Sequence, residues 1–122
     1  MNPDSFESFV ADALRSLPSD FSSKLDNVEI MVEEWPDEET LRTAGVRNRR
    51  DLLGFYHGVP HSKRTHNYSV VLPDRITLYR QPIELRCRTR EDLRATIYHV
   101  LYHEIAHHFG ISDQRLREIG AY

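Results

Sequence analysis

The chain has 122 residues, of which 39% are hydrophobic and 29% are charged, and its formal net charge is −3. This length predicts one domain over residues 1–122, and the composition is that of a folded globular protein rather than of a disordered tail. No apolar run approaches the roughly 18 residues that span a bilayer, and the N-terminus lacks the basic and apolar segments of a signal peptide. The single cysteine, Cys87, cannot form an internal disulfide. We therefore expect a cytoplasmic protein with no membrane partner.

The first half of the sequence predicts two helices and two strands. Apolar residues at helical spacing predict an amphipathic helix over residues 6–17, and Pro18 would end it. Apolar residues that alternate along residues 28–33 predict a half-buried strand. A short acidic helix is expected over residues 38–43, and residues 52–58 form a second candidate strand.

The second half contains a polar segment, two extended segments and further helices. Residues 60–67 are polar and basic without periodicity, so we expect an exposed loop. Residues 68–72 and 75–80 are separated by a Pro-Asp pair and are both expected to be extended. Pro82 suits the first turn of a short helix, and a last short helix is expected over residues 114–119.

The best-defined element is a long helix that starts near Thr89 and ends before Gly110. Thr89 is followed three residues later by Asp92, which is close to a capping box, and glycine is a natural helix terminator. Apolar residues recur along this helix at helical spacing: Leu93, Ile97, Val100, Leu101, Ile105 and Ala106. The helix carries the sequence His-Glu-Ile-Ala-His at residues 103–107.

Two histidines of this motif, His103 and His107, are four residues apart and therefore lie on the same face of the helix. Two imidazoles that converge there suit a tetrahedral Zn²⁺ ion. Glu104 lies beside them, where it can take a proton from a metal-bound water without being a ligand. Shuffled sequences of this composition would contain the pattern in about 3% of cases, and its position in a periodic helix lowers that risk. The alternative is that the two histidines only cover a helix face.

The third ligand that we expect is Asp113, six residues after His107. Asp113 can reach the metal only if the helix stops and the chain reverses, and Gly110 tolerates the left-handed conformation that such a reversal uses. A site of two histidines and one aspartate leaves a fourth position open for water, which is typical of catalytic zinc. In the alternative, Asp113 caps the terminal helix at residues 114–119.

Other potential ligands have weaker support. His99 lies one turn before His103; it either approaches the metal or, as we prefer, is a buried and hydrogen-bonded core histidine. His108 points about 100° away from His107 around the helix, so we expect it to pack or to support a ligand. Glu118 is the one glutamate downstream of the motif. No spacing argument supports the remaining candidates, which are Cys87, His57, His61 and His66.

Three segments resemble one known family, the minimal zincin-like metallopeptidases, which are short single-domain bacterial proteins. They are LYHEIAHHFGISD at residues 101–113, LLGFYHGVP at 52–60 and LPDRITLYR at 72–80. The resemblance therefore extends from about residue 52 to the C-terminus. It implies an α+β fold with a zincin-like core, in which a small mixed sheet packs against the helix that carries the motif.

The same resemblance implies roles for individual residues. His103, His107 and Asp113 would be the zinc ligands, and Glu104 would be the general base. His99 departs from the family pattern, in which a small or apolar residue is expected at this position.

These observations predict a zinc metallopeptidase that hydrolyses peptide bonds with a metal-bound water and Glu104 as the general base. Its partner would be a peptide or protein substrate. By the same resemblance, the substrate would bind as an added strand at a sheet edge. Residues 75–80, whose arginines suit an exposed edge, are the candidate edge, with an ordinary paired strand as the alternative. The candidates for a further oxyanion donor are His99, Tyr79 and Tyr102.

A second hypothesis belongs to another class: a zinc-binding protein that does not hydrolyse peptides and acts as a binding module through its basic half. Residues 45–122 carry thirteen basic and eight acidic side chains, whereas residues 1–44 carry three and eleven. The simpler interpretation is that these charges neutralise one another in the folded protein. No recognised nucleic-acid motif accompanies the arginines, so we do not expect a nucleic-acid partner.

Overall fold

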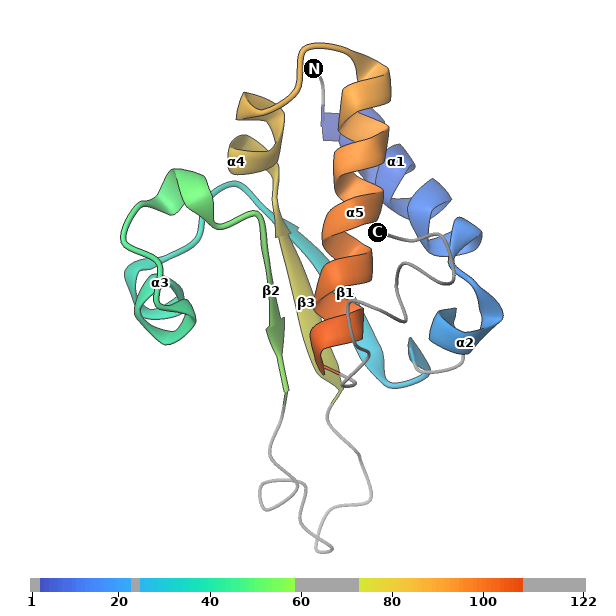
Figure 1. Cartoon of the computed structure of the whole chain (residues 1–122), viewed down its shortest axis with the longest axis horizontal. Coiled ribbons are helices and arrows are strands. Elements are labelled where there is room, and N and C mark those ends of the chain that lie inside the picture. Colours follow the sequence, from blue (N-terminus) through green and yellow to red (C-terminus); the bar gives the residue numbers. More distant parts are fainter. Residues whose placement is uncertain (1–2, 23–24, 59–72, 109–122) are drawn as a thin grey trace, which may run out of the picture.

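The computed structural model describes residues 3–22, 25–58 and 73–108. In chain order its elements are α1 (Pro3–Ser16), α2 (Ser19–Ser22), β1 (Val28–Glu33), α3 (Glu38–Ala44), the 3₁₀ helix η2 (Arg49–Asp51), β2 (Gly54–His57), β3 (Asp74–Tyr79), α4 (Arg80–Leu85) and α5 (Arg90–His108) (Figure 1). This arrangement is α+β, as predicted. The segments predicted over residues 60–67, 68–72 and 114–119 lie outside the described residues. Within the described ranges, no helix is long and apolar enough to cross a membrane.

Local side-chain and backbone signals fix the ends of two helices. The carboxylate of Asp37 accepts a hydrogen bond from the backbone N–H of Thr40 at 2.7 Å and so caps α3, which Gly45 ends with a φ of 72°. At the start of α5, the hydroxyl of Thr89 accepts a hydrogen bond from the N–H of Asp92 at 3.0 Å, and the Asp92 carboxylate accepts one from the N–H of Thr89 at 3.3 Å. This reciprocal pair is a capping box, and it fixes where the long helix begins.

The three strands form one sheet in the order β1-β3-β2. β3 is parallel to β1 and antiparallel to β2, so the sheet is mixed and β3 is its central strand. The prediction that residues 75–80 form a sheet edge is therefore wrong. Arg75 lies opposite Glu29 of β1, with 3.8 Å between the charged groups. Arg80 belongs to α4 rather than to the strand.

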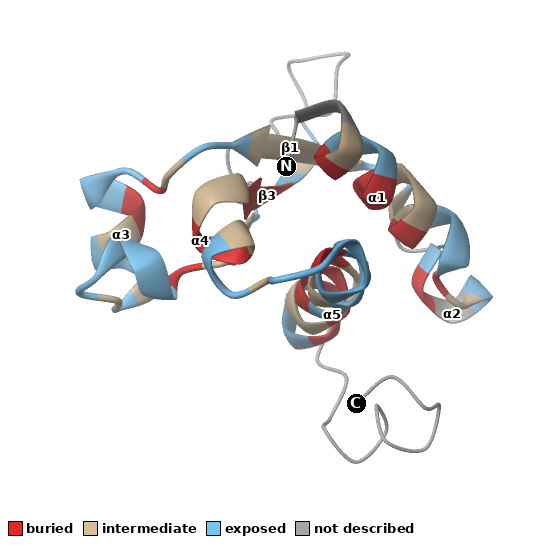
Figure 2. Ribbon diagram, turned by 90° about the horizontal axis from the view of Figure 1, so that it is seen from above, coloured by how far each residue is buried: buried red, intermediate tan, exposed pale blue. Residues whose placement is uncertain are grey.

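A hydrophobic core lies between one face of this sheet and the helices α1 and α5. Ile76 and Leu78 of β3 are fully buried in it. Figure 1 shows α5 in front of the sheet with α1 beside it, and Figure 2 marks buried residues on these elements. Every residue of the predicted apolar stripe of α5 is buried: Leu93, Ile97, Val100, Leu101, Ile105 and Ala106. Because each such side chain contributes about 1.5–3 kcal/mol when buried, the stripe determines which face of α5 turns away from the core.

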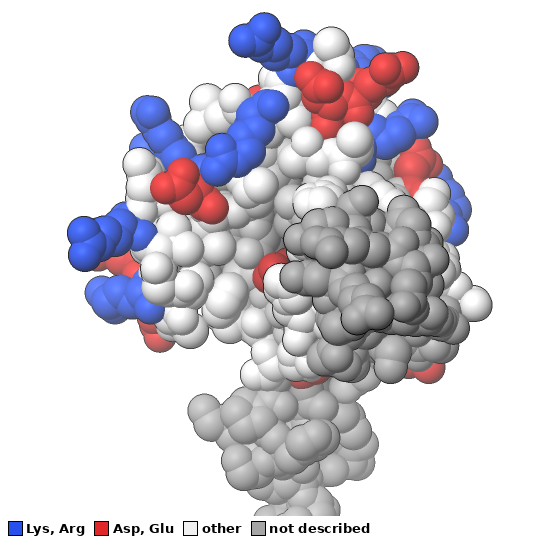
Figure 3. Space-filling model, in the orientation of Figure 1, with Lys and Arg blue, Asp and Glu red and all other residues white. Residues whose placement is uncertain are grey.

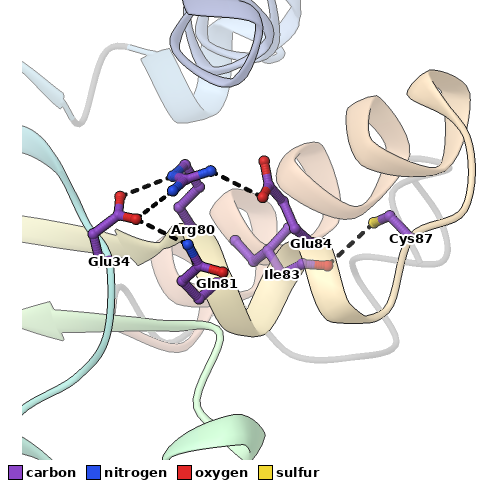
Figure 4. A network of polar contacts seen from close by, with 6 residues as sticks. All are labelled: Glu34, Arg80, Gln81, Ile83, Glu84 and Cys87. Atoms are coloured by element: carbon purple, nitrogen blue, oxygen red, sulfur yellow. Dashed lines mark hydrogen bonds and ion pairs between the residues drawn. The ribbon is translucent and has the colours of Figure 1, made fainter. Parts of the chain in front are cut away.

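An ion-pair network joins the end of β1 to α4 (Figure 4). The guanidinium of Arg80 donates to both carboxylate oxygens of Glu34, one of them from Nε at 2.8 Å, and to Glu84 at 2.9 Å. Gln81 donates to Glu34 through its side chain at 3.0 Å and through its backbone N–H at 3.1 Å. Since the side chain of Arg80 is only 13% exposed, this network is a structural junction rather than a surface contact.

The charged halves of the sequence meet in the fold. Glu29 and Glu34 come from the acidic half and pair with Arg75 and Arg80 of the basic half. On the face shown in Figure 3, arginines and carboxylates of the described residues alternate around the rim. Both observations favour mutual neutralisation over a single-signed binding surface.

Candidate metal centre

The C-terminal half of α5 lies close against the edge strand β2, and a glycine makes this approach possible. A Cβ atom at Gly54 would lie only 2.6 Å from Cγ1 of Val100 and 3.3 Å from the carbonyl oxygen of Thr77. The first distance is too short for any Cβ contact and the second is tight, so the absence of a side chain at Gly54 lets the helix approach the strand. The residues that follow Val100 on α5 are therefore held beside β2.

His103 and His107 lie next to each other on α5, as their spacing predicts. Their ring centroids are 5.4 Å apart and the rings are inclined by 82°. His103 is half-buried, whereas His107 is exposed to solvent. Within the described ranges, no three histidine, cysteine, aspartate or glutamate side chains gather around one point. The third predicted ligand, Asp113, lies outside the described residues, and so do Glu118, His61 and His66.

Glu104 turns from the same helix toward β2 and is largely buried there. Burial raises the pKa of its carboxyl to about 7, although a hydrogen bond from the backbone N–H of Tyr56 opposes this shift. The carboxyl group is therefore close to half ionised at neutral pH, which is the range in which a group both accepts and donates protons efficiently.

The sheet register explains why the Tyr56 N–H reaches Glu104. The N–H of Tyr79 donates to the carbonyl of Leu53 at 2.9 Å, so the hydrogen-bonded pairs of this antiparallel ladder fall on the odd-numbered residues of β2. Gly54 and Tyr56 belong to the other class of pair, whose N–H and C=O groups point away from β3. These groups face the side of β2 that points away from β3, where Glu104 accepts the hydrogen bond from the Tyr56 N–H.

His108 packs away from the two motif histidines, as predicted. Its ring stacks on that of Tyr56, with centroids 3.6 Å apart and an angle of 9°. Its Nε2 lies 3.6 Å from Oδ2 of Asp74, and the hydroxyl of Tyr56 donates to the same oxygen at 3.0 Å. These three residues come from α5, β2 and β3, so the cluster joins the last turn of α5 to the sheet.

The preferred interpretation of His99 is wrong. His99 is exposed rather than buried, and its ring lies 4.2 Å from that of His103, inclined by 52°. His99 therefore lies at the surface, beside the half-buried ring of His103.

Two candidate oxyanion donors are buried and already hydrogen-bonded, although the charge of Glu104 contributes to the raised pKa of Tyr79. Tyr102 is buried against Phe21 and its hydroxyl bonds that of Tyr98 at 2.8 Å, on the side of α5 that faces away from Glu104. Tyr79 is 2% exposed and forms a hydrogen bond with Thr40 of α3, and burial raises its pKa to about 12. Neither hydroxyl is presented to solvent beside His103.

The weaker ligand candidates within the described residues also have other surroundings. Cys87 lies before α5, with its sulfur 3.2 Å from the carbonyl oxygen of Ile83 and 3.5 Å from the hydroxyl of Thr96. His57 is exposed on β2 and its ring contacts that of Phe55. Neither lies among the contacts of the two motif histidines.

Sequence reasoning missed two contributors to this site. The Tyr56 contact with Glu104 uses a backbone group, which has no signature in the side-chain sequence. Asp74 follows a proline at the start of β3, and nothing in that position indicates that it meets His108, 34 residues later. Only the pairing of β2 with β3 could have suggested that Tyr56 and Asp74 are neighbours.

Comparison with known proteins gives one family. The family of zincin-like metallopeptidases, as described by its sequence profile, matches residues 25–121 of the chain. None of the curated proteins compared with the chain matches it. The matched region includes the whole sheet, α5 and the motif at residues 103–107. With most of its length matched, this chain belongs to the zincin-like metallopeptidase family.

Proposed function

We propose that the protein is a zinc-dependent peptidase in which His103, His107 and Asp113 hold the metal and Glu104 is the general base. The observation that carries this proposal is the position of Glu104. A largely buried carboxyl group with a pKa of about 7 lies on the same helix as two neighbouring imidazoles and accepts a hydrogen bond from a backbone N–H of β2. A carboxylate with only a structural role would be expected to have a cationic partner instead.

The two imidazoles fit a zinc ion. His103 and His107 lie one helical turn apart with their ring centroids separated by 5.4 Å, so both would hold the ion through ring nitrogens. A zinc ion held there would supply a Lewis acid and an acidified water for hydrolysis. The aspartate is proposed from its spacing after Gly110, as the family pattern implies.

Glu104 would move the proton. As a carboxylate it accepts a proton from the attacking water, and as a carboxylic acid it delivers that proton to the nitrogen of the leaving amine. In the metal-free protein burial raises its pKa to about 7, so the fold itself does not lock Glu104 in the charged form. The Tyr56 N–H holds the carboxylate in a defined orientation, which reduces the motion needed before each transfer.

The edge of β2 that faces away from β3 is the place where a peptide substrate would bind. Gly54 directs its outward N–H and C=O groups to this edge, beside the Tyr56 N–H that donates to Glu104, and among the described residues no further strand pairs there. An extended peptide could add there as a further strand and so place its backbone beside the catalytic base. This edge replaces residues 75–80 as the candidate peptide-binding edge, because β3 lies at the centre of the sheet.

A peptide-library digest with zinc-loaded protein tests the proposal. Glu104→Gln should retain its zinc while cleavage falls by about 100-fold or more, because the amide cannot accept the proton. Glu91→Gln, an exposed change in the first turn of the same helix, is the matched control and should cleave as the parent does. Equal cleavage by the Glu104 variant would exclude it as the base. If the parent binds zinc and cleaves no peptide, the binding-module hypothesis replaces this one.

A further inference from the structure

β1 is the second edge strand of the sheet, and the backbone groups of its even-numbered residues point outward. The N–H of Asp74 donates to the carbonyl of Asn27 at 2.9 Å, and Val28 lies opposite Asp74 in the parallel register. In such a ladder, alternate residues direct their N–H and C=O groups to the partner strand. The groups of Val28, Ile30 and Val32 therefore point away from β3, and among the described residues no strand pairs with them.

The apolar face of the sheet continues to this edge without being fully covered. Ile30 lies opposite Ile76 and Val32 lies opposite Leu78, so each pair shares the core face of the sheet. The two β3 residues are fully buried, whereas the two β1 residues are only half-buried. A groove of about 440 Å³ lies between this part of β1 and α1. It is lined by Val10, Ala11, Leu14, Ile30, Met31 and Val32, together with Glu7.

Two exposed carboxylates lie on the opposite face of the same edge. Because side chains alternate along a strand, Glu29 and Glu33 point away from the core face. Glu29 is 3.8 Å from Arg75, and its side chain remains 48% exposed. Within the described part of the chain, no basic side chain forms an ion pair with Glu33. A strand added at this edge would therefore meet apolar side chains on one face and carboxylates on the other.

These carboxylates argue against a second copy of this chain as the occupant of the edge. If two β1 strands paired antiparallel through their outward groups, odd-numbered residues would lie opposite odd-numbered residues. Glu29 or Glu33 would then lie opposite or diagonal to a glutamate of the other copy in every register centred on the strand. Like charges in these positions destabilise a strand pair, whereas opposite charges stabilise it. The edge is therefore suited to a basic partner.

We propose that the outer edge of β1 docks an extended segment of a partner protein in which apolar and basic residues alternate. The backbone of the segment pairs with the outward groups of β1 as an added strand. Its apolar side chains enter the groove beside α1, and its lysine or arginine side chains lie across from Glu29 and Glu33. This surface is separate from the β2 edge, because β3 lies between β1 and β2. Docking there does not require the metal.

Peptide binding to the full-length protein tests this assignment. The probe is a blocked octapeptide of alternating lysine and valine, and an octapeptide of alternating glutamate and valine is its counterpart. Both are titrated into zinc-loaded protein carrying Glu104→Gln, which prevents cleavage. The lysine peptide should bind about tenfold more tightly than the glutamate peptide, because opposite charges then face each other across the strands. Glu29→Lys/Glu33→Lys, added to this protein, should reverse the preference.

Glu38→Lys/Glu39→Lys is the matched control, because it changes the net charge equally at exposed residues of α3 and should leave the preference unchanged. A second readout locates the peptide: hydrogen exchange at the amides of Val28, Ile30 and Val32 should slow when the lysine peptide binds. Equal affinity for the two peptides, or unchanged exchange at these amides, overturns the proposal. Either result leaves cleavage by the parent untouched, so the proposed function would survive it.

Discussion

Two glutamates from different regions of the molecule are held in opposite ways. Glu34, at the junction of β1 and α4, is half-exposed, and its hydrogen bonds with Arg80 and Gln81 lower its pKa to about 2. Glu104, beside β2, is largely buried, and that burial raises its pKa to about 7. The first carboxylate stays ionised at any physiological pH, whereas the second titrates near neutrality.

This difference separates a structural acid from a candidate catalytic one. The pKa of Glu104 depends mainly on burial. Among the described residues, its carboxylate is stabilised by a backbone N–H rather than by an arginine. A fold that left Glu104 beside a guanidinium would keep it permanently charged and make it a poor proton donor. The contrast also predicts that mutations in the two regions have opposite effects on stability.

The largest effect is expected from removing the arginine of the structural junction. Arg80→Ala leaves Glu84, whose side chain is 15% exposed, without its cation and should cost about 3 kcal/mol of unfolding free energy. Urea denaturation measures this loss, and NMR titration should show the pKa of Glu34 rising toward its ordinary value. Arg86→Ala, which removes an exposed ion pair with Asp51, is the control and should cost less than about 1 kcal/mol. Equal losses for the two variants would contradict a structural role for the junction.

Removing the charge of Glu104 should instead stabilise the metal-free protein. The folded-state pKa lies above the ordinary value of 4.5, so folding favours the protonated form. The stability of the parent is therefore complete below about pH 4.5 and declines as the pH rises to about 7. Glu104→Gln cannot ionise and should be about 2–3 kcal/mol more stable than the parent at pH 8, with no difference near pH 4.

Thermal unfolding in a chelator at several pH values measures that difference. Glu91→Gln on the exposed face of α5 should show no such pH dependence. A Glu104 variant that is less stable than the parent at pH 8 would mean that the carboxylate has a favourable partner in solution, and the contrast with Glu34 would fail.

A smaller loss is expected where the helix that carries Glu104 meets the sheet. Gly54→Ala places a methyl group 2.6 Å from Cγ1 of Val100, and overpacking of this kind costs about 1–2 kcal/mol. The change should also move α5 away from β2 and weaken the contact between Glu104 and the Tyr56 N–H. Adding Val100→Ala to Gly54→Ala creates space for the methyl group. If Gly54→Ala costs as much stability in the Val100→Ala background as it does in the parent, the close approach of Val100 is not the cause of the loss.

The smallest effect is expected at the cluster beside the site. Tyr56→Phe keeps the ring that stacks on His108 and the backbone N–H that reaches Glu104, but it removes the hydroxyl that donates to Asp74 at 3.0 Å. The expected loss of unfolding free energy is about 1 kcal/mol. Cleavage by zinc-loaded protein should persist, since the backbone contact remains. A loss of cleavage larger than the loss of stability explains would assign the Tyr56 hydroxyl a role in the reaction.

Much of the secondary structure could be read from neighbouring residues. The period of two along residues 28–33 predicted β1 and the helical period predicted α1 and α5, because each pattern depends only on residues that are close in the chain. The capping box of Thr89 and Asp92 and the glycine after α3 are equally local. α2 was missed because its four residues are too few for a periodic signal, although Phe21 within it is 1% exposed.

The motif at residues 103–107 was also sufficient to place two histidines and a glutamate together on one helix, and to indicate the family. The helical spacing brings the imidazoles together whatever the rest of the fold does. The sequence could not show that Glu104 is buried beside β2, because that burial depends on the close approach of Val100 to Gly54, 46 residues apart in the chain.

The sequence by itself determined the motif and most of the described elements, since both depend on contacts between residues a few positions apart. Only the tertiary structure decided that β3 is central, that His99 faces solvent beside His103, and that a backbone N–H of β2 holds Glu104. The amino-acid composition of residues 75–80, including its arginines, is the same whether the strand lies at an edge or at the centre of a sheet. The pairing of Arg75 with Glu29 and of Arg80 with Glu34 distinguishes the central position from an edge. Each glutamate is more than 45 residues away from its arginine in the chain.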